Sequence, residues 1–178
     1  MSVAQTPSIY ETTFAKTDRT DAILVVEGKK LHVNKTLLSI HSDYFNTLFN
    51  SNFKEKSMSE IEIKDVKFED FATLLSLVHP KPIDPSAEYD KAENLLKLAE
   101  KFSLPYAKNY MDLFFGITRM HYFDKLELAN KYNLPTLTVN ALRYFTTRGQ
   151  IFSYSHALKN YSDRTKARVY ERLAELPN

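Results

Sequence analysis

The sequence predicts an α+β fold, in which a small sheet is covered by many helices. Three short apolar stretches that predict strands lie within residues 23–63. From residue 65 onward, apolar side chains recur at helical spacing. A helical segment also recurs after about 30 residues, which is typical of stacked helical hairpins. Strands early in the chain and helices later together favour this fold class.

The first predicted elements are a pair of strands. Residues 23–26 are apolar and partly β-branched, and residues 31–33 alternate apolar and polar side chains. Gly28 lies between them and can adopt the positive φ that a tight turn needs. A hairpin this small requires a helix packed over it, so we expect helices to follow.

Two short helices are predicted next. Asn34 is a favourable N-cap for a helix over residues 35–40, and Ser42 is a favourable N-cap for the helix after it. The second helix carries one apolar stripe, formed by Tyr44, Phe45, Leu48 and Phe49. A charged linker over residues 53–59 and a brief strand around Ile61 complete this part of the chain.

The rest of the chain is predicted to be helical. Residues 65–78 place apolar side chains on one helix face, and Pro80 requires that helix to have ended. Residues 98–105 (LAEKFSLP) recur as residues 128–135 (LANKYNLP), so each copy ends a helix at a Leu-Pro corner. Later helices are expected over residues 106–117, 136–146, 152–160 and 162–175.

The composition disfavours several classes of function. With 43% hydrophobic residues the chain can form a packed core, and a net charge of +2 is too balanced to indicate a nucleic-acid or membrane partner. The absence of cysteine excludes disulfides, zinc–thiolate sites and thiol catalysis. No apolar run approaches the roughly 20 residues that span a bilayer, and no signal peptide is recognisable. We therefore expect a cytoplasmic or nuclear protein.

No catalytic or metal-binding motif is recognisable in the sequence. The five histidines lack the i, i+4 spacing of helical zinc sites, and three glycines are too few for a phosphate-binding loop. His41 with Asp43 and His121 with Asp124 are the two pairs suited to ligate a metal, but ordinary surface or helix-end histidines are the better interpretation. Basic residues within 163–172 are interrupted by acidic ones, which favours a solvated helix face. We expect no cofactor, no metal and no enzymatic activity.

Residues 21–78 resemble a BTB/POZ domain. The resemblance is carried by the apolar strand pair around Gly28, the brief strand at Ile61 and two spacings: Lys35-x-x-Leu38 and Ser42-x-x-Phe45. Residues 95–102 resemble the family's penultimate helix. The helices beyond resemble the 3-box or shortened BACK extension of MATH–BTB adaptors, with nematode-type proteins as the nearest likeness.

Three parts are expected along the chain. Residues 1–17 are polar and without a clear period, so they are predicted to form an N-terminal arm with little structure of its own. The resemblance implies a BTB/POZ domain over residues 18–118 and a helical 3-box/BACK-like extension over residues 119–178. No MATH, kelch or zinc-finger module is recognisable, so the substrate protein is unidentified.

The resemblance implies a cullin-3 adaptor, in which a hydrophobic–x–Glu motif contacts the cullin-3 N-terminal domain. Phe53-Lys54-Glu55 fills the place of that motif. Phe53 is suited to be an aromatic anchor, and Glu55 to pair with a basic group of the partner. From the residues alone, Phe53 can equally continue the Phe45 and Phe49 stripe and close the core. The resemblance favours the cullin contact.

Further contacts are predicted around the same helix. The cullin surface is expected to include also Tyr44, Asn46, Asn50 and Tyr106, although Tyr44 can equally belong to the core. A homodimer or BTB heterodimer is expected, with an interface drawn from Ile9, Tyr10, Phe14, Asp21, Leu37 and Leu38. The alternative function is a BTB dimerisation or scaffold module that does not bind cullin.

Overall fold

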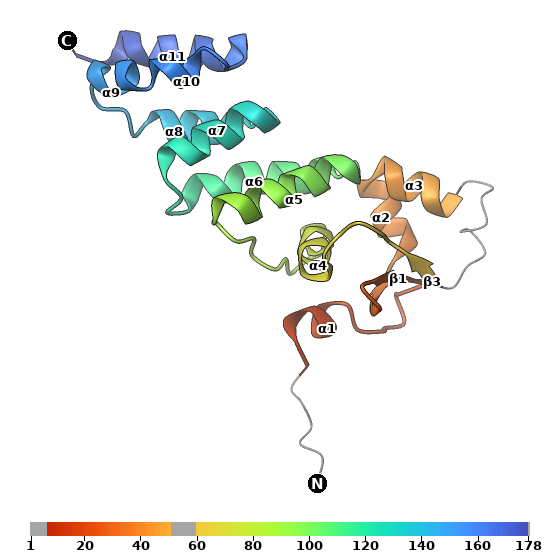
Figure 1. Cartoon of the computed structure of the whole chain (residues 1–178). Coiled ribbons are helices and arrows are strands. Elements are labelled where there is room, and N and C mark those ends of the chain that lie inside the picture. Colours follow the sequence, from red (N-terminus) through yellow and green to blue (C-terminus); the bar gives the residue numbers. More distant parts are fainter. Residues whose placement is uncertain (1–6, 51–59, 178) are drawn as a thin grey trace. The chain divides into compact units, whose positions relative to one another are not determined.

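A computed structural model describes residues 7–50 and 60–177 of the chain (Figure 1). The chain divides into two compact units: unit 1 comprises residues 1–86 and 94–108, and unit 2 comprises residues 87–93 and 109–178. The division passes through helices α5 (Tyr89–Lys101) and α6 (Pro105–Ile117). These units reflect the density of contacts within the chain and do not define family domains. The domain boundaries at residues 18, 118 and 119 therefore stay predictions.

Unit 1 contains a three-stranded sheet with the order β2-β1-β3. Strands β1 (Ala22–Val26) and β2 (Lys29–Val33) are antiparallel, which confirms the predicted strand pair. Glu27 and Gly28 both have positive φ, 49° and 74°, as a two-residue hairpin turn of type I′ requires. The brief third strand, β3 (Glu60–Glu62), is also confirmed, and it pairs in parallel with β1.

Helices α2 (Lys35–His41) and α3 (Asp43–Asn50) begin at the two predicted caps. The side chain of Asn34 accepts a hydrogen bond from the Leu37 N–H at 2.7 Å. Ser42 Oγ accepts one from the Phe45 N–H at 3.1 Å. These bonds satisfy amide groups that a helix start leaves unpaired, so the helix boundaries follow from the sequence.

The core of unit 1 is built around aromatic rings. Phe45 stacks on Phe102 with ring centroids 5.9 Å apart, and Phe71 meets Phe102 edge-on at 5.0 Å. All three side chains are fully buried. Each such burial contributes roughly 1.5–3 kcal/mol to folding, so this cluster fixes α3 and α4 against the end of α5.

Helix α4 (Phe68–Ser76) starts later than the sequence predicted. The prediction placed the start at residue 65, but Asp65 has φ 60°, a left-handed conformation that a helix excludes. The Phe68 N–H donates instead to the Glu27 carboxylate at 2.9 Å. The start of α4 is therefore set by the hairpin turn, which local propensity does not reveal.

The predicted unstructured N-terminal arm is wrong for the residues that the structure describes from Pro7 onward. Helix α1 (Ile9–Thr13) begins with a capping box between Ser8 and Glu11. Phe14 is buried, and its carbonyl oxygen accepts a hydrogen bond from the His32 N–H at 3.1 Å. Poor helix propensity is overridden here by the cap and by packing of Phe14 against the domain.

The two Leu-Pro corners have the same geometry, as the sequence repeat predicted. Ser103 and Asn133 both take left-handed φ, 49° and 51°, after the preceding helix. The Leu104 N–H then reaches back to the Ala99 carbonyl at 2.8 Å, and Leu134 repeats this contact at 2.9 Å. This is the Schellman type of helix end, after which α6 and α8 (Pro135–Leu142) begin.

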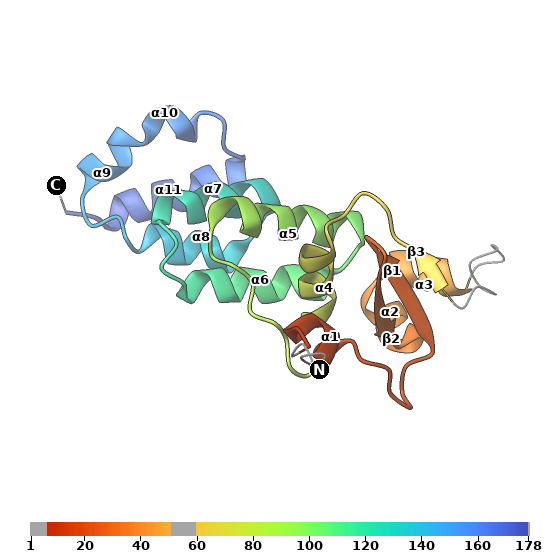
Figure 2. The same cartoon turned by 60° about the horizontal axis from the view of Figure 1, so that its bottom comes forward.

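Unit 2 is helical throughout its described residues. Helix α7 (Tyr122–Tyr132) packs against α8. The chain then continues through α9 (Arg148–Ser153), α10 (Ser155–Leu158) and α11 (Asp163–Glu175), with Ser162 as the predicted N-cap of α11. Figure 2 shows α9 and α10 running alongside α11. None of the described helices is long and apolar enough to cross a bilayer.

Two predicted helices of unit 2 have different bounds in the structure. The helix expected over residues 136–146 ends at Leu142, and a capping box formed by Thr147 and Gln150 starts α9 a few residues later. The single helix expected over residues 152–160 is two short helices, α9 and α10, which meet at Tyr154. Neither difference alters the predicted α+β class.

Candidate protein-interaction surface

A buried serine ties the corner between α2 and α3 to the end of α5. Ser42 Oγ donates to the Phe102 carbonyl oxygen at 2.6 Å while it accepts from the Phe45 N–H. The Ser42 side chain is nearly inaccessible to solvent, so water competes little for this hydrogen bond. The corner is therefore held in one geometry, and the side chains beside it are held with it.

Aromatic side chains stand exposed on both sides of this corner. Tyr44 is 37% exposed, and its ring meets the Phe102 ring edge-on at 5.0 Å. Tyr106 is 52% exposed and lies 5.2 Å from the His41 ring. The Tyr44 ring thus packs on the core and keeps an accessible side, and its predicted contact with cullin stays a prediction.

The outer side of α3 carries two exposed asparagines one helical turn apart. Asn50 Nδ2 donates to Asn46 Oδ1 at 2.8 Å. That bond uses one amide hydrogen and one carbonyl oxygen, so further donors and acceptors of the two side chains face outward. Asn46 and Asn50 thus supply polar groups on α3, on the other side of the buried Phe45 and Phe49 from Tyr44.

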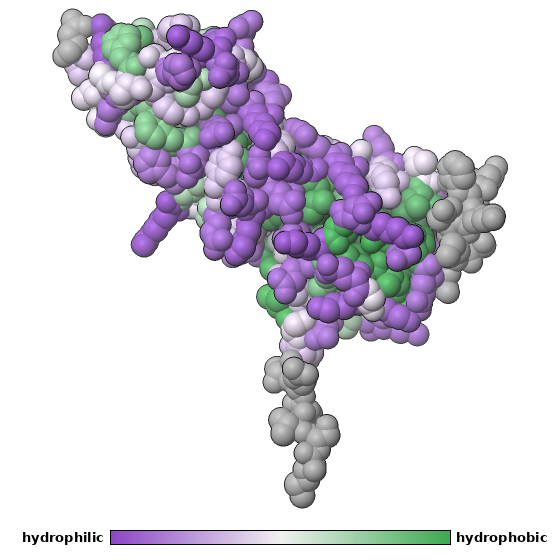
Figure 3. Space-filling view, in the orientation of Figure 1, coloured by the Kyte–Doolittle hydropathy of each residue, from purple (hydrophilic) through white to green (hydrophobic). Residues whose placement is uncertain are grey.

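We call this set the corner surface and define it by Ile40, His41, Tyr44, Asn46, Asn50 and Tyr106. Ile40 is 72% exposed and was not predicted to be part of any site. Ile40 lies two residues after the buried Leu38 and therefore on the opposite face of α2. Helix periodicity in the sequence could thus have predicted that Ile40 is exposed. Figure 3, in which each residue is coloured by its hydropathy, shows hydrophobic residues gathered on unit 1 between α5 and β3.

Phe53 and Glu55 lie outside the described residues, in the segment 51–59. Their predicted roles as anchor and paired carboxylate stay predictions. Helix α3 ends at Asn50, so the segment starts at the end of the helix that carries Tyr44 and Asn46. Of the other four predicted cullin-contact residues, three lie on α3 and Tyr106 lies beside His41 at the end of α2. Their contact with cullin stays a prediction.

A groove of about 560 Å³ lies beside α1 and α2 within unit 1. Its lining includes Thr13, His32, Leu37, His79 and Tyr106. We call it the α1–α2 groove. Burial lowers the pKa of His79, whose ring also packs edge-on against Phe14 at 5.2 Å.

Three of the six residues predicted for self-association have accessible positions. Ile9 is 59% exposed on α1, Leu37 is half-buried in the α1–α2 groove, and Tyr10 is half-buried with its ring against Phe68. These three side chains are accessible to a second chain.

The other three hold unit 1 together. Phe14 and Leu38 are sealed in the core. Asp21 Oδ1 accepts the Lys35 N–H at 2.7 Å and so fixes the start of α2. Phe14 and Leu38 are buried in the single chain, so their predicted place in the interface stays a prediction that this conformation does not favour. The dimer itself stays a prediction.

The described residues show no arrangement of three or more His, Asp or Glu side chains suited to a metal ion. What the corner surface offers instead is exposed aromatic and amide groups on a fixed backbone. Such a surface suits binding to another protein.

The family model of the BTB/POZ domain matches residues 10–116. The chain belongs to the BTB/POZ domain family. The match covers the whole sheet and helices α2 to α6, so the predicted family and fold are confirmed, with a helical extension after the domain. The corner surface and the α1–α2 groove therefore both lie on the BTB/POZ domain.

Several curated proteins are similar to this chain. It is 32% identical over 174 residues to BTB and MATH domain-containing protein 38 of Caenorhabditis elegans, covering 95% of this chain and 44% of that protein. It is 33% identical over 138 residues to BTB and MATH domain-containing protein 36 of the same organism, covering 77% and 42%. Kelch-like protein 21 of Danio rerio is 26% identical over 157 residues, covering 86% and 23%. The chain thus spans less than half the length of these relatives.

Among solved structures, the BTB domain of human gigaxonin is similar, with 21% identity and a TM-score of 0.45. The similarity covers 64% of this chain and 96% of that one.

Proposed function

We propose that this BTB/POZ chain is an adaptor that links a substrate protein to a cullin-3 ubiquitin ligase. In this proposal the cullin-3 N-terminal domain contacts the corner surface together with Phe53 and Glu55. The similarity to BTB and MATH domain-containing proteins and to a Kelch-like protein supports an adaptor role.

The observation that carries the proposal is the pair of exposed tyrosines beside the buried Ser42 corner. Tyrosine is among the residues that most often dominate binding energy in protein interfaces. Because the Ser42–Phe102 hydrogen bond already fixes the corner, little ordering entropy is lost when a partner binds. Ile40 adds apolar area, and the asparagines of α3 add hydrogen-bonding groups around it.

Calorimetric titration with the cullin-3 N-terminal domain tests this proposal. We expect the parent chain to bind. Tyr106→Ala and Phe53→Ala should each weaken binding by about tenfold or more, as expected for aromatic anchors. Glu55→Ala should have a smaller effect that decreases at high salt, because a rim ion pair is screened.

Tyr170→Ala is the matched control, since Tyr170 is an exposed tyrosine of unit 2 at 66% exposure. It should leave cullin binding unchanged. Absence of binding by the parent chain, or binding by Tyr106→Ala, Phe53→Ala and Glu55→Ala that equals that of the parent, would contradict the proposal.

A self-associating scaffold without cullin binding is the second candidate. The exposed Ile9 on α1 and the adjoining α1–α2 groove favour it, since both offer surface to a second chain. Sedimentation of the parent and of Ile9→Ser separates the candidates. A dimer that dissociates in Ile9→Ser, together with no heat on cullin titration, would support the scaffold function alone.

A further inference from the structure

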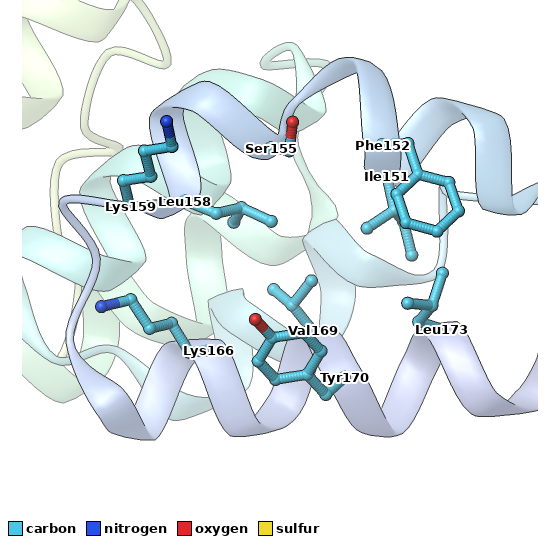
Figure 4. Close-up of a pocket in the computed structure, with 9 residues that line it drawn as sticks. All are labelled: Ile151, Phe152, Ser155, Leu158, Lys159, Lys166, Val169, Tyr170 and Leu173. Carbon is cyan, nitrogen blue, oxygen red and sulfur yellow. The ribbon is translucent and has the colours of Figure 1, made fainter.

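A second groove, which we call the C-terminal groove, lies within unit 2 between α11 and the α9–α10 segment (Figure 4). Its volume is about 460 Å³. Ile151 from α9 and Val169 from α11 form its buried floor, and Leu158 and Leu173 add apolar walls. Ligand pockets in proteins commonly have volumes of about 300–1,000 Å³. The groove is therefore large enough to hold several side chains of a partner.

Two aromatic side chains line the same groove and are largely exposed. Phe152 is 59% exposed on α9, and Tyr170 stands opposite on α11. A single exposed aromatic residue needs no explanation, but two that line one apolar groove form a contiguous surface. Exposed apolar surface of this kind is typical of an interaction site.

The charges around the groove have a single sign. Lys159 and Lys166 lie together at one end, away from Phe152 and Leu173 (Figure 4). No carboxylate is among the described residues that line the groove. Asp163 lies 3.8 Å from Lys166 Nζ, but its side chain is fully exposed, so this ion pair is weak. An occupant with a carboxylate at this end would complement both ammonium groups.

We propose that the C-terminal groove binds an acidic amphipathic helix of another protein. A helix fits better than an extended segment, because its backbone N–H and C=O groups are paired internally. The groove is lined by helices and offers no strand edge to an extended backbone, and its polar side chains are limited to Ser155, Tyr170 and the two lysines. The apolar face of the occupant lies over Ile151 and Val169.

The length of the groove sets the pattern of the occupant. Lys166 and Leu173 are seven residues apart on α11, which corresponds to about 10 Å along the helix. An occupant helix therefore places apolar residues at i, i+3 or i+4, and i+7, and a glutamate or aspartate beyond one end of that stripe. The proposal is independent of cullin binding, since every residue it uses belongs to unit 2 and none to the corner surface.

A displayed peptide library tests the proposal with the full chain as bait. The peptides are about 14 residues long, with leucine fixed at i, i+3, i+4 and i+7 and the remaining positions drawn equally from Glu, Lys, Gln and Ala. We expect selected peptides to be enriched in glutamate near one end. Selected peptides should also lose binding when a central position is replaced by proline, because proline breaks the helix.

Variants of the chain then locate the binding site. Lys159→Gln with Lys166→Gln should weaken binding of a selected peptide by about three- to tenfold, and Tyr170→Ser by about tenfold. Arg164→Gln with Arg168→Gln is the matched control, since it removes the same charge from α11 outside the groove. It should change the affinity by less than about twofold.

Three results would overturn the proposal. One is a selection without glutamate enrichment, or without any binder. Another is equal weakening by the groove variants and by the arginine control. The third is a concentration-dependent dimer that Phe152→Ser abolishes, because a second copy of the chain would then occupy the groove.

Discussion

The two units hold their helix ends together with different kinds of polar group. In unit 1, a neutral hydroxyl on Ser42 lies between the Phe102 carbonyl oxygen and the Phe45 N–H. In unit 2, the buried ammonium group of Lys125 donates to the carbonyl oxygens of Gly116 and Thr118, at 2.9 and 2.8 Å. The junction of unit 1 therefore keeps its geometry without a charge, whereas that of unit 2 depends on one.

The two charged side chains at the helix ends of unit 2 have the signs that the helix dipoles favour. Lys125 meets the C-terminal end of α6, where the helix dipole is negative, and its Nζ lies 5.6 Å from the Tyr144 ring centroid. At the start of α8, the buried Asp112 accepts the N–H groups of Thr136 and Leu137 at 3.1 and 2.7 Å. Burial lowers the pKa of Lys125, because removing the ammonium group from water disfavours its charged form.

The largest effect is expected for Lys125→Met, which keeps much of the side-chain volume and removes the charge. Two buried carbonyl oxygens lose their donor, so the free energy of unfolding should fall by about 3 kcal/mol. Hydrogen exchange followed by NMR should show the loss of protection in α7 and α8 rather than in β1 and β2.

Lys159→Met is the control for this prediction, because Lys159 is exposed. Its effect should stay within about 0.5 kcal/mol. If Lys125→Met were as stable as the parent, the contrast between the two units would be wrong.

A smaller effect is expected for Ser42→Ala in unit 1. The substitution leaves the Phe102 carbonyl oxygen and the Phe45 N–H unpaired, so the free energy of unfolding in urea should fall by about 2 kcal/mol. The exposed Ser153, whose hydroxyl donates to the Gln150 carbonyl oxygen, is the control. A loss as small as that of Ser153→Ala would show that the corner does not depend on its hydroxyl.

The smallest effect is a pH dependence in unit 1 that comes from His79. Since burial lowers its pKa, the unfolded chain binds more protons between the folded-state pKa and about 6.5. Unfolding free energy should therefore decrease as the pH falls through this window and stay constant above it. Urea unfolding at a series of pH values should show a weaker decrease in His79→Gln.

His32 and His41 line the same groove and remain in both proteins, so their contribution cancels in this comparison. His156→Gln, at an exposed histidine of unit 2, is the control. Identical pH profiles for the parent and His79→Gln would contradict the assignment.

Features fixed by neighbouring residues were predictable from the sequence. The Gly28 turn, the caps at Asn34 and Ser42, and the two Leu-Pro corners depend on contacts within a few residues. Helix periodicity also placed Tyr44, Asn46 and Asn50 on α3, whereas the ring contact of Tyr106 with His41 joins residues far apart in the chain.

Features that depend on distant contacts were not predictable. Helix α1 is fixed by the buried Phe14, whose carbonyl oxygen accepts the His32 N–H of β2. Helix α4 starts where the Glu27 carboxylate accepts the Phe68 N–H. Lys125 looks like a surface lysine in sequence, since nothing nearby reveals that it is buried against the end of α6. The C-terminal groove was missed because the predicted helix over residues 152–160 is broken in two.

Methyl NMR with isotope-labelled isoleucine tests the central claim most directly, by adding the unlabelled cullin-3 N-terminal domain to the chain. The account predicts that the Ile40 methyl signal, at the corner surface, shifts or broadens on titration. The Ile117 signal, from a still more exposed isoleucine of unit 2, should change much less. An unchanged Ile40 signal at saturating cullin-3 would contradict docking at the corner surface.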